Sequence, residues 1–178
     1  AYEYRKNLGS ELAKETDINA DLVVPVPDSG VPAALGYAET SNKKFELGLI
    51  RNHYVGRTFI EPTQNIRSLG VKLKLSSTKT IVQNKSIILI DDSLVRGTTC
   101  HKIVKMLYES GAKEVHVRIA CPEIRYPDFY GVDMPNKKEL LANEKNNQEI
   151  CEYINAKTLK FLSLDGLYKA IVGEKRNA

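Results

Sequence analysis

Long apolar runs are absent from this sequence, and cysteine is scarce. No run approaches the ~20 apolar residues that a membrane-spanning helix needs, and the first ten residues are polar and charged, unlike a secretory signal. Cys100, Cys121 and Cys151 are widely spaced and form no C-x-x-C pair, which argues against a disulfide framework and a local zinc or iron–sulfur motif. We expect a soluble, cytoplasmic protein whose cysteines are small buried residues.

The common nucleotide-binding fingerprints are also missing. Neither G-x-x-x-x-G-K-[ST] nor G-x-G-x-x-G occurs, which argues against a P-loop and against a dinucleotide-binding site. There is no internal repeat and no low-complexity tract. The 178 residues are 42% hydrophobic and 27% charged, a globular composition that fits one domain over residues 1–178.

Short apolar, β-branched runs predict strands of a sheet that is covered on both faces. These runs are Leu22–Val26, Glu46–Ile50, Ser86–Ile90, Val115–Ala120 and Leu159–Leu164. Helical patterns predict helices at Tyr2–Glu15, Val31–Glu39, Thr99–Ser110, Lys138–Ala142, Gln148–Ile154 and Asp165–Ile171. Strands that alternate with helices indicate an α/β fold with a parallel sheet, whose ligands bind beyond the carboxyl ends of the strands.

Two polar stretches interrupt this alternation. Asn52–Ser77 is a long connection with weak periodicity, and such connections in compact domains are usually functional lids or disordered segments. The overlapping window Arg51–Lys74 holds five basic residues and one acidic residue, Glu61. Its net charge of +4 therefore equals that of the whole chain. This window suits a polyanionic substrate, a nucleic acid or a solvated face. The second stretch, Lys137–Asn147, is predicted to be a surface element.

The strongest local signal is the segment Leu89–Thr99, which ends a predicted strand and opens a predicted helix. Its core reads Asp91-Asp92-Ser93-Leu94-Val95-Arg96-Gly97-Thr98-Thr99. A helix N-terminus holds an anion such as phosphate through unpaired N–H groups and the positive end of its dipole. The threonines add hydroxyl donors, and the glycine lets the backbone approach closely. The paired aspartates suit sugar hydroxyls or a hard divalent cation, although in isolation they could be helix-capping residues.

A second segment follows the first predicted strand. Val24–Gly30 reads VPVPDSG and leads into the helix that begins near Val31. Taken alone, its proline, serine and glycine residues could simply make a turn. Together, the two segments resemble the type I phosphoribosyltransferases, which bind phosphoribosyl pyrophosphate (PRPP).

The resemblance implies the type I phosphoribosyltransferase fold, a central, mostly parallel sheet flanked by helices, with a flexible lid loop at about 51–77. In that family, two acidic residues bind the ribose 2′- and 3′-hydroxyls, the following loop wraps the 5′-phosphate, and the turn after the first strand meets the pyrophosphate. The substrate-binding residues implied are Asp28, Ser29, Gly30, Asp91, Asp92, Ser93, Arg96, Gly97, Thr98 and Thr99. A magnesium site is implied at Ser29, Asp91 and Asp92.

The basic window makes the resemblance more specific. The segments Arg51–Pro62, Ala120–Pro127 and Phe129–Pro135 are similar to those of the glutamine PRPP amidotransferase family. The similarity extends from about Tyr4 to Val172. Members of that family make phosphoribosylamine from PRPP and ammonia in the first committed step of purine synthesis. The resemblance implies that Tyr54, Arg57 and Lys74 are catalytic residues that fold over the pyrophosphate.

The chain also departs from that family. Members of that family carry a glutaminase domain that begins with a nucleophilic cysteine, whereas residue 1 here is Ala and no cysteine precedes Cys100. We therefore expect a chain that depends on ammonia, with the N-terminal glutaminase domain of a full-length enzyme, or a separate subunit, as its partner. Asp128 stands near a ligand cysteine of one subgroup, so no iron–sulfur cluster is predicted. The resemblance further implies a homo-oligomer, without a nucleic-acid or membrane partner.

Two alternatives stay open. A base-specific phosphoribosyltransferase would share the Asp91–Thr99 loop but should lack the Tyr54–Phe59 motif. A PRPP-sensing regulator of the same fold that binds nucleic acid would need a basic surface outside the lid, and its binding would depend on salt. The charges outside Arg51–Lys74 largely balance.

Overall fold

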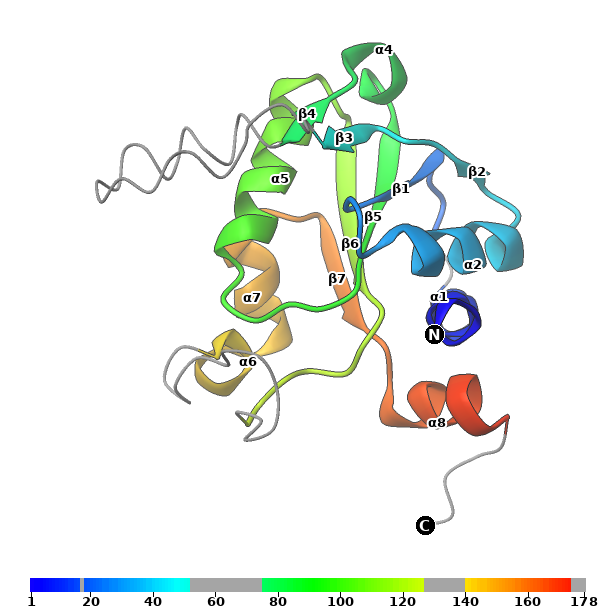
Figure 1. Cartoon of the computed structure of the whole chain (residues 1–178). Coiled ribbons are helices and arrows are strands. Elements are labelled where there is room, and N and C mark those ends of the chain that lie inside the picture. Colours follow the sequence, from blue (N-terminus) through cyan, green and yellow to red (C-terminus); the bar gives the residue numbers. More distant parts are fainter. Residues whose placement is uncertain (17, 52–74, 127–139, 174–178) are drawn as a thin grey trace, which may run out of the picture.

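The computed structural model describes residues 1–16, 18–51, 75–126 and 140–173 (Figure 1). A five-stranded sheet of order β2-β1-β5-β6-β7 lies at its centre, and all neighbouring strands are parallel. The strands are β1 (Leu22–Pro25), β2 (Lys44–Phe45), β5 (Ser86–Asp91), β6 (Glu114–Ile119) and β7 (Thr158–Phe161). The predicted parallel α/β architecture is confirmed.

Helices cover both faces of the sheet (Figure 1). On one face lie α1 (Tyr2–Glu15), α2 (Val31–Ser41) and α8 (Leu164–Val172). On the other lie α4 (Lys79–Val82), α5 (Thr98–Glu109), α6 (Leu141–Glu144) and α7 (Asn147–Tyr153). None of the helices in the described part of the chain has both the length and the apolar character that crossing a bilayer requires.

The central strand β5 shows why this sequence folds into a sheet with two covered faces. Ile87 and Leu89 pack into the cluster beneath α5, whereas Ile88 and Ile90 pack beneath α1 and α2. All four side chains are fully buried. A strand buried on both faces reads as a continuous apolar run, as the sequence of β5 does.

The first and last described helices pack against each other. The Asn7 side chain of α1 donates to the carbonyl of Ala170 in α8 over 3.3 Å. At the other end of the pair, the Ser163 N–H donates to the Glu15 carboxylate over 3.0 Å. Helix α1 also packs closely on α2. It therefore lies between α2, which is near the start of the chain, and α8, which is the last described helix.

Two glycines set the close approach of α1 and α2. A Cβ atom at Gly9 would overlap the Ala33 carbonyl, and one at Gly36 would overlap the Lys6 carbonyl. The backbones of the two helices therefore lie too close for any side chain at these positions.

Replacing Gly36 with alanine is expected to lower the free energy of unfolding by about 1–3 kcal/mol, because the methyl group would force the helices apart. Helix propensity alone predicts the opposite sign, since alanine is favoured over glycine by about 1 kcal/mol in a helix interior. Urea denaturation followed by circular dichroism separates the two effects. A variant at least as stable as the parent would show that the contact tolerates the methyl group.

The region around the predicted strand Glu46–Ile50 differs from the prediction. Strand β2 ends at Phe45, before the predicted strand begins. The N–H of Gly48 then donates to the carbonyl of Glu46 over 2.9 Å, and only the last two residues of the predicted strand belong to β3 (Leu49–Arg51). β3 pairs antiparallel with β4 (Leu75–Ser77), so the last residues of the predicted lid are strand and not loop. The remaining lid residues, 52–74, lie outside the described part of the chain.

The prediction of a surface element at Lys137–Asn147 is wrong at its centre. Leu140 is fully buried, and Leu141 is 8% exposed. The last two residues of the predicted helix Lys138–Ala142 lie in helix α6 (Leu141–Glu144), whereas Leu140 precedes that helix; residues 138 and 139 lie outside the described part. Leu140 and Leu141 are flanked mostly by charged and polar residues, so their burial could not be predicted from the sequence pattern.

Candidate substrate site

The two segments singled out in the sequence meet at one edge of the sheet. β1 and β5 are neighbours, with Pro25 opposite Ile90, and the Val26 N–H donates to the Ile90 carbonyl over 2.8 Å. The turn Asp28–Gly30 follows β1, and the loop Asp92–Gly97 follows β5. Between β1 and β5 the strand order changes direction, and ligands of open α/β sheets bind at such switch points.

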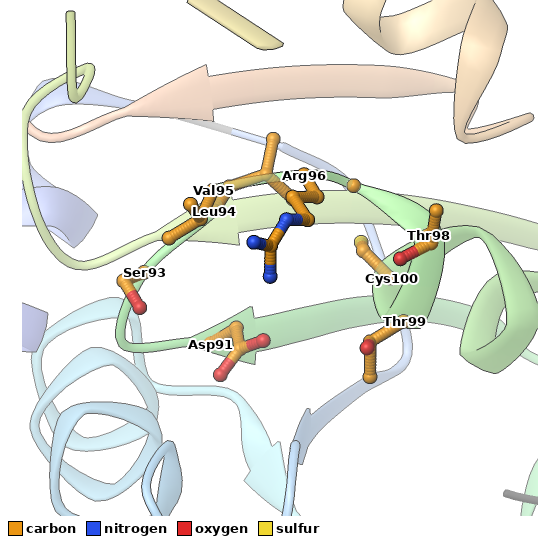
Figure 2. A pocket seen from close by; sticks show the side chains of 9 residues that line it. Asp91, Ser93, Leu94, Val95, Arg96, Thr98, Thr99 and Cys100 are labelled. Atoms are coloured by element: carbon orange, nitrogen blue, oxygen red, sulfur yellow. The ribbon is translucent and has the colours of Figure 1, made fainter. Parts of the chain in front are cut away.

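A cavity of about 240 Å³ lies between the end of β5 and the start of α5. In Figure 2 the side chains of Asp91, Arg96, Thr98 and Thr99 gather around it. The residues that line it are Asp91, Ser93, Leu94, Val95, Arg96, Gly97, Thr98, Thr99 and Cys100. The lining combines a carboxyl group, a guanidinium and hydroxyl groups, which suits a ligand that carries both sugar hydroxyls and phosphate.

Asp91 is the most perturbed carboxyl group of the site. Burial raises its pKa from 3.8 to about 7, and the charge of Asp92 adds to the rise. The Asp92 N–H, which donates to its Oδ1 over 2.8 Å, and a hydrogen bond from the Ser29 side chain act in the opposite direction. The Ser29 contact brings the turn after β1 and the end of β5 together, as the sequence predicted. A cation bound nearby would lower this raised pKa, because it favours the ionised form of the carboxyl group.

Gly97 starts helix α5 and shapes the floor of the cavity. Its φ of 73° lies in the left-handed region, which favours glycine. As the N-cap residue it supplies no side-chain acceptor for the first-turn N–H groups of α5. These groups are left to a ligand in the cavity, and the helix dipole favours an anion there.

The turn Asp28–Gly30 is held from two sides. The Gly30 N–H donates to the Val26 carbonyl over 2.9 Å, and Gly30 is also the N-cap residue of α2. The Asp28 carboxylate pairs with Arg51 at the end of β3 over 2.8 Å, but both side chains are more than half exposed. An ion pair this exposed contributes little to stability. It does link the turn to the strand that leads into residues 52–74.

Two cysteines lie close to the carboxyl groups. Burial raises the pKa of the Cys100 thiol to about 12, with the charge of Asp91 adding to it, and burial with the charge of Asp92 raises that of Cys121 to about 12. Both stay protonated thiols near neutral pH and so are poor nucleophiles. Cys100 is buried as predicted, whereas Cys121 and Cys151 are only partly buried.

The structure therefore brings together most of the residues that the sequence suggested. Asp91, Ser93, Arg96, Gly97, Thr98 and Thr99 line the cavity, while Ser29 contacts Asp91. Asp92 follows Asp91, and Asp28 and Gly30 lie in the adjacent turn. Tyr54, Arg57 and Lys74 lie outside the described residues. Sequence reasoning missed Arg51 as the partner of Asp28, and it missed Leu141 and Tyr153 beside Gly97, because no local pattern signals contacts between distant segments.

Within the described ranges, no group of three or more His, Cys, Asp or Glu side chains could hold a metal ion by itself. Asp91 and Asp92 offer two carboxyl groups. Magnesium is commonly bound by one or two carboxylates together with substrate phosphates and water. The residues present thus fit a magnesium ion that arrives with a phosphate ligand.

Comparisons with known proteins agree with this geometry. The family described as "Phosphoribosyl transferase domain" matches residues 5–150. The amidophosphoribosyltransferase of Rhizobium etli is 58% identical over 177 residues, which cover 99% of this chain and 36% of the relative. That of Methanocaldococcus jannaschii is 53% identical over 170 residues, which cover 96% of this chain and 36% of the relative. The chain spans just over a third of the length of these relatives.

Solved structures show the same fold. The glutamine PRPP amidotransferase from B. subtilis, complexed with ADP and GMP, matches with a TM-score of 0.89 at 49% identity, over 99% of this chain and 39% of that chain. A structure described as the allosteric regulatory enzyme of purine biosynthesis matches with the same TM-score and identity, over 38% of its chain. The expected type I phosphoribosyltransferase fold is confirmed. The chain belongs to the phosphoribosyl transferase domain family.

Proposed function

We propose that this chain transfers the phosphoribosyl group of PRPP to ammonia, forming 5-phosphoribosylamine and releasing pyrophosphate. The observation that carries the proposal is the cavity at the end of β5, where the partly buried carboxyl group of Asp91 and the N-terminus of α5 line the same space. The relatives named amidophosphoribosyltransferase favour ammonia as the acceptor.

Each part of PRPP has a matching part of the site. Asp91 and Asp92 accept hydrogen bonds from the ribose 2′- and 3′-hydroxyls. The loop Ser93–Gly97 and the first N–H groups of α5, with Thr98 and Thr99, hold the 5′-phosphate. The turn Asp28–Gly30 lies beside Asp91 and meets the pyrophosphate. These roles follow the family pattern at positions where the sequence carries it.

We further propose that Asp91, Asp92 and Ser29 hold magnesium together with the substrate. The raised pKa of Asp91 supports this assignment, because a cation would favour its ionised form. The chemistry that magnesium supplies when bound is neutralisation of charge on the departing pyrophosphate. The residues of the chain orient the ribose and its phosphate, so that C1 stays exposed to the acceptor.

In the reaction, the nitrogen lone pair of ammonia forms a bond to C1 of the ribose. The bond between C1 and the pyrophosphate oxygen breaks, and its electron pair leaves with the pyrophosphate. The new ammonium group then loses a proton to solvent. Because neutral ammonia is already a nucleophile, no general base is required. By the family pattern, Tyr54, Arg57 and Lys74 would close over the pyrophosphate and exclude water that could hydrolyse PRPP.

The relatives are longer than this chain, and the whole protein's role is part of the proposal. We propose that it supplies the first step of purine synthesis in the cytoplasm, and that a glutaminase domain or subunit delivers ammonia from glutamine. The amidophosphoribosyltransferase relatives extend beyond the matched region, which covers 36% of each of them. A homo-oligomer is expected by the same resemblance.

The test incubates the chain with PRPP, magnesium and ammonium at about pH 8.5 and measures pyrophosphate release. We expect release that depends on ammonium and on magnesium, and that glutamine does not replace ammonium, since neutral ammonia is the attacking species. Release that depends on an added purine or pyrimidine base would instead identify a base-specific phosphoribosyltransferase. Salt-dependent binding to DNA or RNA without turnover would identify a PRPP-sensing regulator.

A further inference from the structure

The segment Leu140–Tyr153, which contains α6 and α7, packs against the outer side of the loop Ser93–Gly97 and is called the wall below. The backbone N–H of Leu141 donates to the carbonyl of Val95, inside the loop, over 3.0 Å. A Cβ atom placed on Gly97 would lie 2.6 Å from Leu141 Cδ2 and 3.1 Å from Tyr153 Cε1. Two side chains from far along the sequence thus close over the glycine at which α5 begins.

This segment is itself firmly anchored. Leu140 and Ile150 are fully buried, and Leu141 and Ile150 belong to the same core cluster as Leu94 of the loop. A capping box fixes the start of α7: the Glu149 N–H donates to the Asn146 side chain over 2.9 Å, and the Asn146 N–H donates to the Glu149 carboxylate over 2.8 Å. The buried side chains and the capping box fix the segment Leu140–Tyr153, and the loop packs against this fixed segment.

Tyr153 also touches the helix that the loop opens into. Its ring lies 6.0 Å from the ring of His101, centre to centre, in the first turns of α5. Tyr153 thus contacts both sides of the junction between loop and helix, at Gly97 and at His101. Neither Leu141 nor Tyr153 is among the residues that line the cavity.

We propose that Leu141 and Tyr153 are positioning residues that set the affinity for the 5′-phosphate without touching it. The phosphate is held by backbone N–H groups, whose directions are fixed only if the loop is fixed. Gly97 has no side chain and a left-handed φ, so its own conformational preference does not hold the loop in place. The wall supplies that restraint from outside. This inference rests on the proposed function of the loop.

The test compares Tyr153→Ala with Tyr168→Ala. Tyr153 and Tyr168 are 40% and 43% exposed, and Tyr168 lies on α8, across the sheet from the loop. Calorimetry or NMR titration would measure the affinity of each chain for ribose 5-phosphate, and separately for magnesium pyrophosphate. Both ligands meet the carboxyl groups of Asp91 and Asp92. Only ribose 5-phosphate also probes the loop Ser93–Gly97, and only magnesium pyrophosphate also probes the turn Asp28–Gly30.

We expect Tyr153→Ala to weaken ribose 5-phosphate binding between about tenfold and a hundredfold, the range that small misplacement of binding groups produces. The affinity of Tyr153→Ala for magnesium pyrophosphate should change less than about twofold. Tyr168→Ala should bind both ligands as the parent does. Tyr153→Phe, which keeps the ring, should bind ribose 5-phosphate with the affinity of the parent. In turnover, the KM for PRPP should rise while kcat changes little.

Two results would overturn the inference and leave the proposed function standing. One is a Tyr153→Ala chain that binds ribose 5-phosphate as tightly as the parent. The other is an equal loss for both ligands, which would indicate general loosening of the domain. If the parent chain binds neither ligand, the proposed function itself is wrong, and the inference that rests on it falls as well.

Discussion

Asp91→Asn is expected to weaken the binding of magnesium-PRPP by at least about thirtyfold. Removing one partner of a buried, hydrogen-bonded charge pair costs about 2–5 kcal/mol, and 2 kcal/mol corresponds to roughly that factor. The substitution keeps the size of the side chain and its carbonyl oxygen but removes the negative charge. Calorimetric titration of the purified chain with PRPP and magnesium measures the loss.

The same substitution should act on stability in the opposite direction. Above pH 7 the parent chain carries a partly buried negative charge at Asp91, whereas asparagine carries none. The melting temperature of the ligand-free variant should therefore equal or exceed that of the parent. Asp165→Asn, at an exposed position in the first turn of α8, is the matched control and should leave PRPP binding unchanged. A variant that binds PRPP normally would remove Asp91 from the site.

The pH dependence of the parent chain is the second large effect. The pKa of Asp91 is raised from 3.8 to about 7, so the folded chain binds this proton more tightly than the unfolded chain does. The stability that this group contributes is fully present below its unfolded pKa of 3.8 and is lost as the pH rises through about 7. The full change is on the order of 4 kcal/mol.

Ligand binding should follow the reverse trend, because magnesium and the ribose hydroxyls need the ionised carboxylate. Below pH 7 the dissociation constant for magnesium-PRPP should rise about tenfold for each pH unit. Thermal denaturation of the ligand-free chain between about pH 4 and pH 8 provides a readout that titration of PRPP itself does not affect. A stability curve with the same slope in the parent and in Asp91→Asn would contradict the assignment of the raised pKa to this residue.

Local patterns in the sequence predicted the core of the fold and one side of the site. The strand β5, the loop after it and the start of α5 are contiguous, so their apolar run, acidic pair and glycine can be read together. The parallel sheet was predicted from five apolar runs, four of which form its strands β1, β5, β6 and β7. The fifth run, Glu46–Ile50, does not join this sheet, and its short strand β2 was not predicted. The features that were predicted need only the preferences of neighbouring residues.

Contacts between distant segments could not be predicted in this way. The run Glu46–Ile50 resembles a buried strand, yet Leu49 is 1% exposed and Ile50 is 50% exposed. Only the pairing of β3 with β4 decides which of them faces the core. Likewise, the polar surroundings of Leu141 gave no sign that it rests on Gly97, because that contact depends on how β6 and β7 bring α6 and α7 back to the loop.

The pairing of α1 with α8 bears on how the chain folds. Its hydrogen bonds join residues 148 and 163 positions apart, so they form only after nearly all of the described chain is in place. During synthesis from the N-terminus, α1 can settle on α2 early, but its second face stays uncovered until α8 emerges. Contacts of such long sequence separation slow folding. The contact between α1 and α8 is therefore expected to be among the last to form.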